Sequence, residues 1–486
     1  MIQMRQLTIK TFLLLLTTAL FSCTSDLKET RPNIVVILCD DLGYGDLSSY
    51  GHPIIQTPHL DKLAEDGIKF TSFYSAAPVC SPARAGLITG RSPNRAGIYD
   101  YIRVAGRETD DCLDLVHLQA DEQTIPAMLK EVGYATCMSG KWHCSAQFNS
   151  DAQPAPGYFG FDHWFATHNN ASPSHENPDN FIRNGEEVGE LKGFSCQIVV
   201  DEVLNWLQNK DAEHPFYVQV WFHEPHEPVA SPQHLVDAYL PGSVNEDQAQ
   251  YFANVANIDD AVGRLVEYLE THHGDNTLVL FTSDNGPETL DRYPRATRSY
   301  GSPGPLRGMK LWTTEGGFRV PGILYWIGKE TYNGTSDAVV SSLDLMPTFA
   351  ALSGAELPVI ELDGQSMIPA IKTGKMERDQ PLLWAFYDAI NVHRVAMRTD
   401  EWKMLARLKN DTAYLPLVHN LYDGNESMVK AAELVDFELY NMNADIDESE
   451  NVAEQYPEIF GEMKELMITE YGNLLEGSHV WSRENE

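Results

Sequence analysis

Continuous apolar runs recur along this chain, and each of them ends in polar residues. Residues 33–39 and 276–283 are rich in Ile, Val and Leu, and residues 134–140 and 215–222 form two further runs. Unbroken runs of β-branched and aliphatic residues are typical of strands buried on both faces of a parallel sheet. In open α/β sheets, ligands bind at the carboxyl ends of such strands. We therefore expect a sheet with its functional residues gathered along one edge.

Helical patterns separate these runs. Apolar residues spaced by three and four mark residues 246–272 as a long amphipathic helix, and shorter helices are expected at 57–67, 124–132 and 199–207. Strands that alternate with helices are characteristic of right-handed crossovers in a mostly parallel sheet. The pattern predicts an α/β fold in which a large, mixed and mostly parallel sheet lies between layers of helices.

The pattern changes in the last quarter of the chain. A polar, charged stretch at 374–380 is followed by a predicted hairpin at 395–405, a strand at 438–441 and an amphipathic helix at 457–471. This order predicts a small antiparallel sheet with one helix. We expect a catalytic domain at residues 31–375 and a smaller α+β subdomain at residues 380–486.

Composition limits the partners of the protein. The chain has 486 residues, and 35 Lys and Arg face 70 Asp and Glu, which gives a formal net charge of −35. Such a charge argues against nucleic acid as a partner. It would also repel an anionic substrate at long range, so that an anion must be bound by a local cationic pocket.

Residues 1–23 have the features of an export signal. Two basic residues precede a short apolar run, and Cys23 follows Leu-Phe-Ser, which is similar to a bacterial lipoprotein box. We expect an exported protein, periplasmic or anchored to the outer membrane by a lipid on Cys23. The alternative is an ordinary cleaved signal with an incidental cysteine. The other cysteines show no paired spacing that would indicate a disulfide framework or a zinc site.

Acidic residues at two predicted strand ends suggest a metal site. Asp40 and Asp41 follow the first apolar run, and Asp284 and Asn285 follow the run at 276–283. A single acidic pair would fit a solvated turn equally well, but two strands that end side by side would present three carboxylates and an amide. Oxygen ligands without His or Cys favour Ca²⁺ or Mg²⁺ over Zn²⁺.

The stretch around Cys80 resembles a nucleophile placed on a turn. An apolar extended run ends before it, and Pro82 suits the first turn of a helix. Cys80 should therefore lie at a helix N-terminus, where free amide groups and Arg84 would favour a bound anion. The alternative is a buried cysteine that acts as a small apolar residue.

The residues from Cys80 to Arg91 resemble the signature of the sulfatase family, Cys-x-Pro-x-Arg followed by Leu-x-Thr-Gly-Arg. This chain has Ala83 where the family often has Ser, and Ile88 lengthens the second part by one residue. Further motifs follow in family order, among them Gly-Lys-Trp-His at 140–143, Pro-His-Glu-Pro at 225–228 and Glu-Gly-Gly-Phe-Arg-Val-Pro at 315–321. The resemblance covers residues 32–453 and implies an alkaline phosphatase-like fold.

The resemblance also implies a mechanism. In the family, the cysteine is oxidised by a sulfatase-maturing enzyme to formylglycine, whose hydrate attacks sulfur. The residues carried over are the calcium ligands Asp40, Asp41, modified Cys80, Asp284 and Asn285, the sulfate-binding Lys141 and Lys310, and the proton-transfer residues His143 and His226. Arg84, within the signature, is a further expected catalytic residue.

The expected substrate is a sulfated saccharide. The loop at 147–185 and the region around His226 look like a bacterial subgroup that acts on sulfated polysaccharides, and we expect a 4-O-sulfate on galactose or N-acetylgalactosamine. His175 and Arg298 are the expected sugar contacts. Two alternatives stay open: a phosphomonoester or phosphonate hydrolase of the same superfamily, and an inactive glycan-binding surface lipoprotein.

Overall fold

The computed structural model describes residues 31–103, 108–211 and 213–484. The predicted export signal, with Cys23, lies outside the described residues. Within them, no helix combines the length and the apolar character needed to cross a bilayer.

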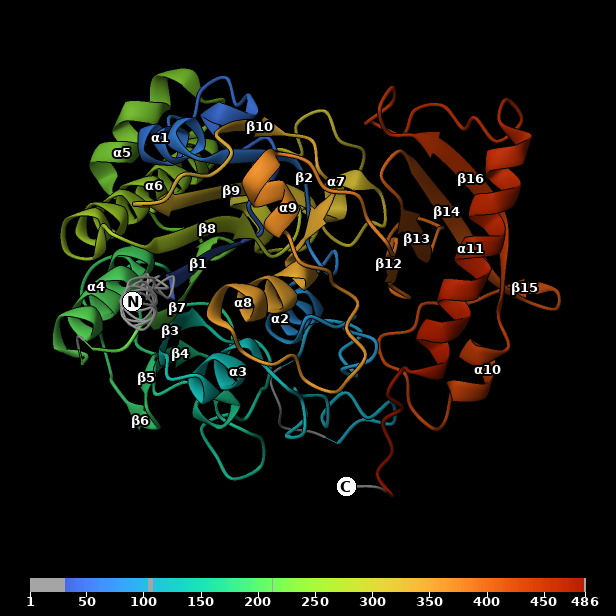
Figure 1. Cartoon of the computed structure of the whole chain (residues 1–486), viewed down its shortest axis with the longest axis horizontal. Helices are drawn as coiled ribbons and strands as arrows, with labels where there is room; N and C mark the ends of the chain where they lie inside the picture. The colour runs from blue at the N-terminus through green and yellow to red at the C-terminus, as the bar shows by residue number, and fades with distance from the viewer. Residues whose placement is uncertain (1–30, 104–107, 212, 485–486) are drawn as a thin grey trace, which may run out of the picture. The chain divides into compact units, whose positions relative to one another are not determined.

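A large mixed sheet forms the centre of the fold, as the apolar runs predict (Figure 1). Its strands are β1 (Asn33–Asp40), β2 (Ile68–Tyr74), β3 (Ala135–Lys141), β4 (His163–Thr167), β5 (Ile182–Arg183), β6 (Glu186–Glu187), β7 (Phe216–Pro225), β8 (Thr277–Ser283), β9 (Arg319–Ile327), β10 (Gly334–Ser336) and β11 (Val340–Ser341). The order is β10-β2-β9-β8-β1-β7-β3-β4-β5-β6, and β11 pairs with β2. The five strands from β8 to β4 are parallel, and β9 runs antiparallel to both of its neighbours.

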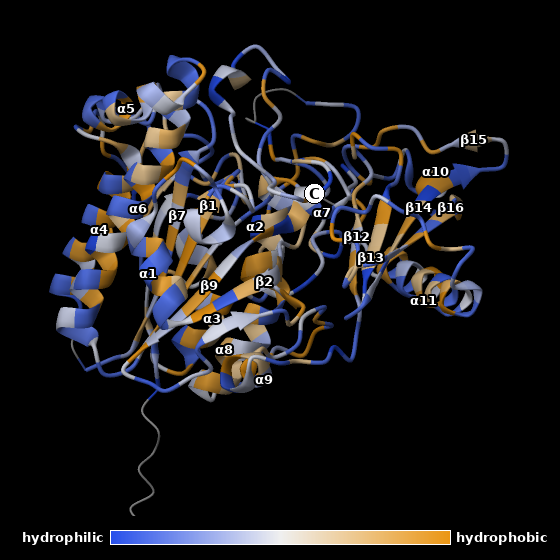
Figure 2. Ribbon diagram, turned by 90° about the horizontal axis from the view of Figure 1, so that it is seen from above, coloured by the Kyte–Doolittle hydropathy of each residue, from blue (hydrophilic) through white to orange (hydrophobic). Residues whose placement is uncertain are grey.

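Helices cover both faces of this sheet (Figure 2). On one face lie α1 (Pro58–Asp66), α4 (Ser195–Asn209) and α6 (Glu246–His273), and on the other lie α2 (Cys80–Thr89), α3 (Ile125–Glu131) and α8 (Leu345–Ser353). The remaining α-helices of the described residues are α5 (Gln233–Tyr239), α7 (Glu315–Phe318), α9 (Ile368–Thr373), α10 (Glu426–Lys430) and α11 (Pro457–Glu476).

Strand β1 explains why the run at 33–39 is apolar throughout. Ile34, Val36 and Leu38 pack into the core shared with α2, α3 and α8. Val35 and Ile37 pack into the opposite core, shared with α1, α4 and α6. Because both faces are covered by helices, the period-two alternation of a half-exposed strand does not appear.

A second, antiparallel sheet lies in the C-terminal region, as predicted. It is built from β12 (Leu382–Ala385), β13 (Val395–Arg398), β14 (Trp402–Asn410), β15 (Ala413–Tyr414) and β16 (Glu433–Asn441). The order is β12-β13-β14-β15, and β16 also pairs with β14. Helix α11 packs on this sheet through Met463, Met467 and Tyr471.

Buried ion pairs connect the two sheets. The Nζ atom of Lys403, on β14, lies 2.8 Å from an oxygen of Glu315 and 2.8 Å from an oxygen of Glu448. The hydroxyl of Tyr74, at the end of β2, donates to the other oxygen of Glu315 at 2.8 Å. The side chains of Lys403 and Glu315 are fully buried.

The structure differs from the prediction in the region expected to be a loop, residues 147–185. Strand β4 pairs in parallel with β3, and β5 and β6 extend the sheet beyond it. Strand β4 is only five residues long, shorter than the buried strands predicted from apolar runs, and polar residues, His163 and Thr167, stand at its ends. Pairing with β3 and burial of Trp164 and Phe165 make it a strand.

Candidate active site

Strand register brings the predicted metal-ligand residues together. In the parallel pair β1 and β8, Cys39 lies opposite Ser283, so both strands end at the same level. The amide of Asp41 donates to Asp284 Oδ1 at 3.2 Å, and the amide of Asp284 donates to the carbonyl of Cys39 at 3.0 Å. The edge of the sheet therefore gathers three buried carboxylates from two separate strands.

The oxygen atoms of this cluster suit a hard cation. Asn285 Nδ2 donates to Asp41 Oδ1 at 2.7 Å, which leaves the side-chain oxygen of Asn285 facing away from that bond. Among the described residues, neither Asn285 Oδ1 nor Asp40 Oδ1 has a hydrogen-bond partner, although both are buried. Ligand atoms of Asp40, Asp284 and Cys80 lie within 4.8 Å of one another. Buried unpartnered oxygens in a carboxylate and amide cluster are the donor set that Ca²⁺ or Mg²⁺ prefers.

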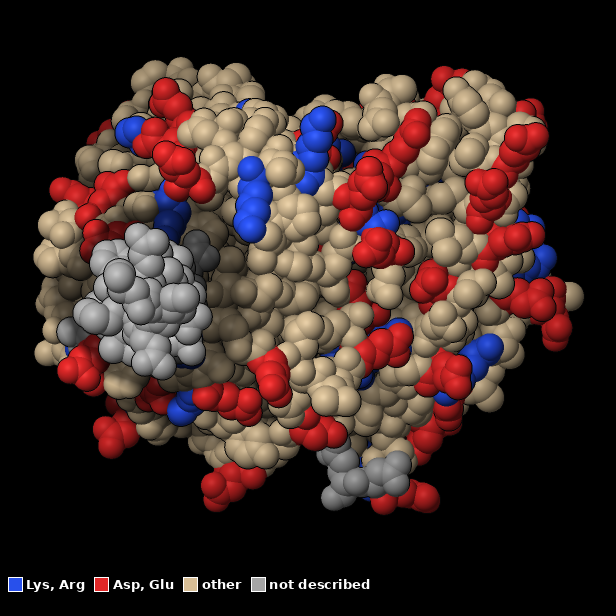
Figure 3. Space-filling view, viewed as in Figure 1, with Lys and Arg blue, Asp and Glu red and all other residues tan. Residues whose placement is uncertain are grey.

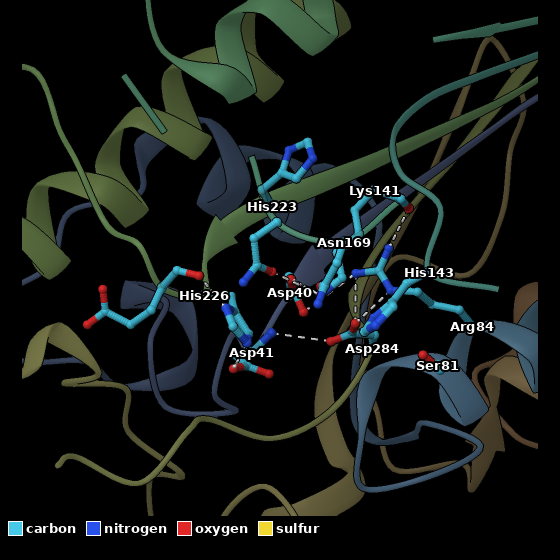
Figure 4. Close-up of polar contacts among 12 residues, drawn as sticks. Asp40, Asp41, Ser81, Arg84, Lys141, His143, Asn169, His223, His226 and Asp284 are labelled. Atoms are coloured by element: carbon cyan, nitrogen blue, oxygen red, sulfur yellow. Dashed lines mark hydrogen bonds and ion pairs between the residues drawn. The ribbon is translucent and has the colours of Figure 1, made fainter. Parts of the chain in front are cut away.

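Three buried cations face the three carboxylates, and Figure 4 shows two of them, Arg84 and Lys141. Lys141 Nζ lies 2.6 Å from Asp40, Lys310 Nζ lies 2.8 Å from Asp41, and Arg84 Nη2 lies 2.7 Å from Asp284. Arg84 also donates through Nη1 to the carbonyl of Lys141 at 2.9 Å. Arg84 is therefore placed to position both Asp284 and Lys141. In Figure 3, acidic side chains are spread over the visible surface of the protein. The three cations, in contrast, are gathered in one buried cluster.

The three carboxylates do not share these cations equally. Burial alone would raise the pKa of Asp40, but the charges of Lys141 and Arg84 hold it well below its usual range. Burial raises the pKa of Asp284 to about 7 in spite of Arg84, and burial also raises the pKa of Asp41. The negative charges thus repel one another, and a divalent cation would relieve this repulsion.

Cys80 is the first residue of α2, as predicted, and Val79 before it is extended. Its side chain is almost completely buried, and burial raises the pKa of the thiol. The thiol is therefore protonated at neutral pH and is a poor nucleophile in this form.

His143 has the geometry of a neutral base. Its Nε2 lies 3.0 Å from the carbonyl oxygen of Ile102, and its buried Nδ1 has no hydrogen-bond partner among the described residues. Burial, then the charge of Lys141, lowers the pKa of His143 well below its usual range. Nε2 must carry the proton to donate to the carbonyl, so Nδ1 holds a free lone pair. The backbone of His143 has φ of 52°, in the left-handed region that residues other than glycine adopt only in a small fraction of cases.

His226 lies beside Asp41, with 3.6 Å between Nε2 and Asp41 Oδ2. Its Nδ1 donates to the carbonyl of Glu227 at 2.6 Å. Burial, together with the charge of Lys310, lowers the pKa of His226 to about 3. The imidazole is therefore neutral in this state of the site, and its Nε2 is an acceptor.

These residues line one open cavity of about 320 Å³. The lining residues are Val79, Cys80, Tyr101, His143, Asn169, His226, Glu288, Arg292, Tyr293, Lys310 and Leu311. Tyr101 and Glu288 belong to no motif in the sequence, and only their position in the fold shows that they line the site. Arg84, Lys141 and the carboxylates lie behind Cys80, buried from solvent.

The two expected sugar contacts lie away from this cavity. His175 is fully buried, 3.3 Å from Asn254 and 3.9 Å from Glu224. Arg298 pairs with Asp247 at 2.9 Å and donates to the carbonyl of Val229 at 2.6 Å. Neither residue lines the cavity. Partners on other elements hold them: Asn254 on α6 and Glu224 on β7 contact His175, and Asp247 on α6 pairs with Arg298. Their positions do not support contact with a sugar bound over Cys80.

Comparisons with known proteins show what this chain is similar to. A family model described as Sulfatase matches residues 32–355. N-acetylgalactosamine-6-sulfatase of Homo sapiens is 34% identical over 370 residues, which is 73% of this chain and 68% of that protein. Arylsulfatase A of Homo sapiens is 32% identical over 469 residues, 90% of this chain and 87% of that protein. The crystal structure of Ps i-CgsB in complex with k-i-k-neocarrahexaose superposes with a TM-score of 0.74 at 28% identity, covering 94% of this chain and 96% of that one.

Proposed function

Since this chain belongs to the sulfatase family and is a sulfuric ester hydrolase, we propose that it acts on sulfate esters of glycans in the cavity over Cys80. The observation that carries this proposal is the convergence of Arg84, Lys141 and Lys310 on the carboxylate cluster behind Cys80. In a chain with a net charge of −35, this buried group of cations is where a sulfate would be stabilised.

Cys80 is the proposed nucleophile position. We propose that a sulfatase-maturing enzyme oxidises it to formylglycine, which when hydrated supplies a hydroxyl nucleophile for attack on sulfur. The raised pKa of the Cys80 thiol supports this, because an unmodified thiol would stay protonated.

The proposed cofactor is Ca²⁺. Asp40, Asp41, Asp284 and Asn285, with the modified Cys80, would hold it, and it would supply positive charge to the sulfate oxygens. Two buried oxygens support this assignment, since neither accepts a hydrogen bond from any described residue: Asn285 Oδ1, and Asp40 Oδ1, which lies 3.6 Å from Arg84 Nη2. Lys141 and Lys310 would share the carboxylate charge with the ion and donate hydrogen bonds to the sulfate.

Two histidines would move protons. His143 lines the cavity with a free lone pair on Nδ1, and can accept a proton from a hydroxyl at position 80. His226 is neutral in the free site, but a sulfate anion bound beside it would raise its pKa. Once protonated, Nε2 can donate to the oxygen of the leaving sugar.

The proposed substrate is a 4-O-sulfate on galactose or N-acetylgalactosamine in a sulfated polysaccharide. An axial sulfate would leave the ring face free for the tyrosines that line the cavity. The likeness to N-acetylgalactosamine-6-sulfatase supports a galacto-configured sugar. The export signal at residues 1–23 supports a periplasmic or outer-membrane location in a bacterium, with Cys23 as the lipid anchor.

The first prediction concerns the ester that is cleaved. We expect kcat/KM for a nitrophenyl sulfate to exceed that for the matching nitrophenyl phosphate by at least about 100-fold, because the chain belongs to the sulfatase family. Sulfate and phosphate release would be measured on the purified full chain. Preferred phosphate release would favour a phosphomonoester hydrolase, and release of neither product would favour an inactive glycan-binding protein.

The proposed sugar specificity would be tested with a panel of saccharides, each with one sulfate at a known position. Galactose, N-acetylgalactosamine and glucosamine sulfates should differ, with fastest turnover of the galacto-configured 4-sulfates. Turnover of glucosamine 6-sulfate alone would contradict the proposed sugar while leaving the sulfatase activity intact.

A second prediction concerns His226. The change His226→Ala should lower kcat for a sugar sulfate by about 10²- to 10⁴-fold, because the leaving alkoxide needs a proton. The loss should be much smaller for nitrophenyl sulfate, whose leaving group is stable as an anion. His234→Ala is a suitable control, because His234 is exposed and does not line the cavity. Equal losses on both substrates would show that His226 does not act as a general acid.

A further inference from the structure

Arg292 is held rigidly at the wall of the cavity. Glu288, whose side chain is 3% exposed, accepts from Arg292 Nε at 2.6 Å and from Nη2 at 2.7 Å. The amide of Thr289 donates to Glu288 at 2.8 Å and fixes the carboxylate in turn. The guanidinium carbon of Arg292 lies 5.1 Å from the centre of the Tyr293 ring. A bidentate pair stacked on an aromatic ring leaves little freedom to the guanidinium.

One edge of this guanidinium stays available. The Arg292 side chain is 34% exposed and lines the cavity. Among the described residues, its Nη1 makes no hydrogen bond, in contrast to Nε and Nη2. Arg292 therefore presents a fixed N–H donor to whatever occupies the cavity.

The charges around Arg292 determine which chemical groups its free N–H can bind favourably. Glu288 neutralises Arg292, and it also lies 3.8 Å from Lys310 Nζ. A second sulfate or a carboxylate beside Arg292 would meet the buried negative charge of Glu288, so the pair offers little net attraction for an anion. An uncharged hydroxyl accepts the same hydrogen bond without that repulsion.

Other groups in the cavity complement this donor. The Oδ1 atom of Asn169 is buried and has no hydrogen-bond partner among the described residues, which makes it an acceptor in need of a donor. The Tyr101 ring is 39% exposed and lines the same cavity. A fixed donor, an unpartnered acceptor and an exposed ring are what adjacent sugar hydroxyls and a sugar face require.

We propose that Arg292, with Asn169 and Tyr101, forms the subsite for the sulfate-bearing sugar and selects for uncharged hydroxyls rather than for a second anionic group. Arg292 is the specificity-determining residue, and Glu288 is the residue that positions it. This inference rests on the proposed sulfatase function of the same cavity.

The test compares a sugar sulfate with an aryl sulfate in the full chain. Arg292→Gln should lower the ratio of kcat/KM for a singly sulfated galactoside to that for nitrophenyl sulfate by about 10- to 100-fold. Arg292→Lys should lower the ratio similarly, because a flexible ammonium does not reproduce the fixed fork. Arg295→Gln is the matched control, since Arg295 is exposed on the same loop and does not line the cavity. Its ratio should equal that of the wild type.

With an active wild type, two results would overturn the inference. The first is a ratio in Arg292→Gln equal to that of the wild type: unchanged rates would show that Arg292 does not contact the sugar, and rates that fall equally on both substrates would show that it only supports Lys310. The second concerns the class of substrate. A loss confined to galactosides with a second sulfate or a carboxylate would show that the subsite binds anions. If the wild type releases sulfate from neither substrate, the proposed function fails and the subsite assignment fails with it.

Discussion

Replacing Cys80 with alanine is expected to abolish sulfate release, with kcat/KM falling by more than about 10⁴-fold, as removal of a nucleophile does in other hydrolases. The reason is that Cys80 is the residue of the cavity against which the three cation-carboxylate pairs converge. Sulfate release by purified Cys80→Ala would be measured against Cys112→Ala. Cys112 is also buried, but it does not line the cavity.

The same position should carry a chemical modification in the active protein. The peptide that contains residue 80 should show the mass of an aldehyde and should react with a hydrazide probe. Full activity in a protein whose Cys80 is an unmodified thiol would contradict the proposed nucleophile.

Loss of the metal is expected to have the next largest effect. Chelation should remove activity, and Ca²⁺ should restore it. Asp284→Asn should weaken Ca²⁺ binding and lower kcat/KM by roughly 10³-fold, because a metal that stabilises transition-state charge contributes several kcal/mol. Binding of Ca²⁺ would be followed by calorimetry, independently of activity.

A matched control separates the metal from general damage. Asp291→Asn changes the same residue type on the following loop, where Asp291 is exposed and at φ of 56°, a conformation that Asn tolerates. It should bind Ca²⁺ as the wild type does. Asp284→Asn also leaves Arg84 with a weaker partner, so the melting temperatures of both variants should be compared. Restoration of activity by Zn²⁺ alone would contradict an all-oxygen calcium site.

The central strands could be predicted because burial on both faces leaves a clear trace in the sequence. The runs at 33–39 and 276–283 became β1 and β8, with bounds that differ by one residue. Strand β4 could not be predicted in the same way, since its five residues become a strand through pairing with β3. Its sequence alone is too short and too polar at its ends.

The site could be predicted in part for a related reason. Parallel strands that end together force Asp40 and Asp284 to one edge, so their proximity follows from the sheet. Tyr101 and Glu288 reach the cavity from segments without regular pattern, and their contribution depends on tertiary packing. For His175, the sequence predicts a sugar contact, but the side chain is buried and lies 3.3 Å from Asn254. A polar residue in a predicted loop can face the interior, and the sequence does not show which way it points.

Lys403 bears on how the chain could be divided. We propose residues 31–375 and 380–486 as its two domains, yet a protein shortened at residue 375 would remove Lys403, one of two cations that pair with Glu315, and would leave only Arg319 at 3.1 Å. Loss of a partner from a buried ion-pair network is destabilising by an amount that matters to a marginally stable domain. Glu315 also begins α7, whose Gly316 amide donates to the carbonyl of Arg307, three residues before Lys310. The catalytic region should therefore not be an autonomous folding unit, and both domains should unfold together in one cooperative transition.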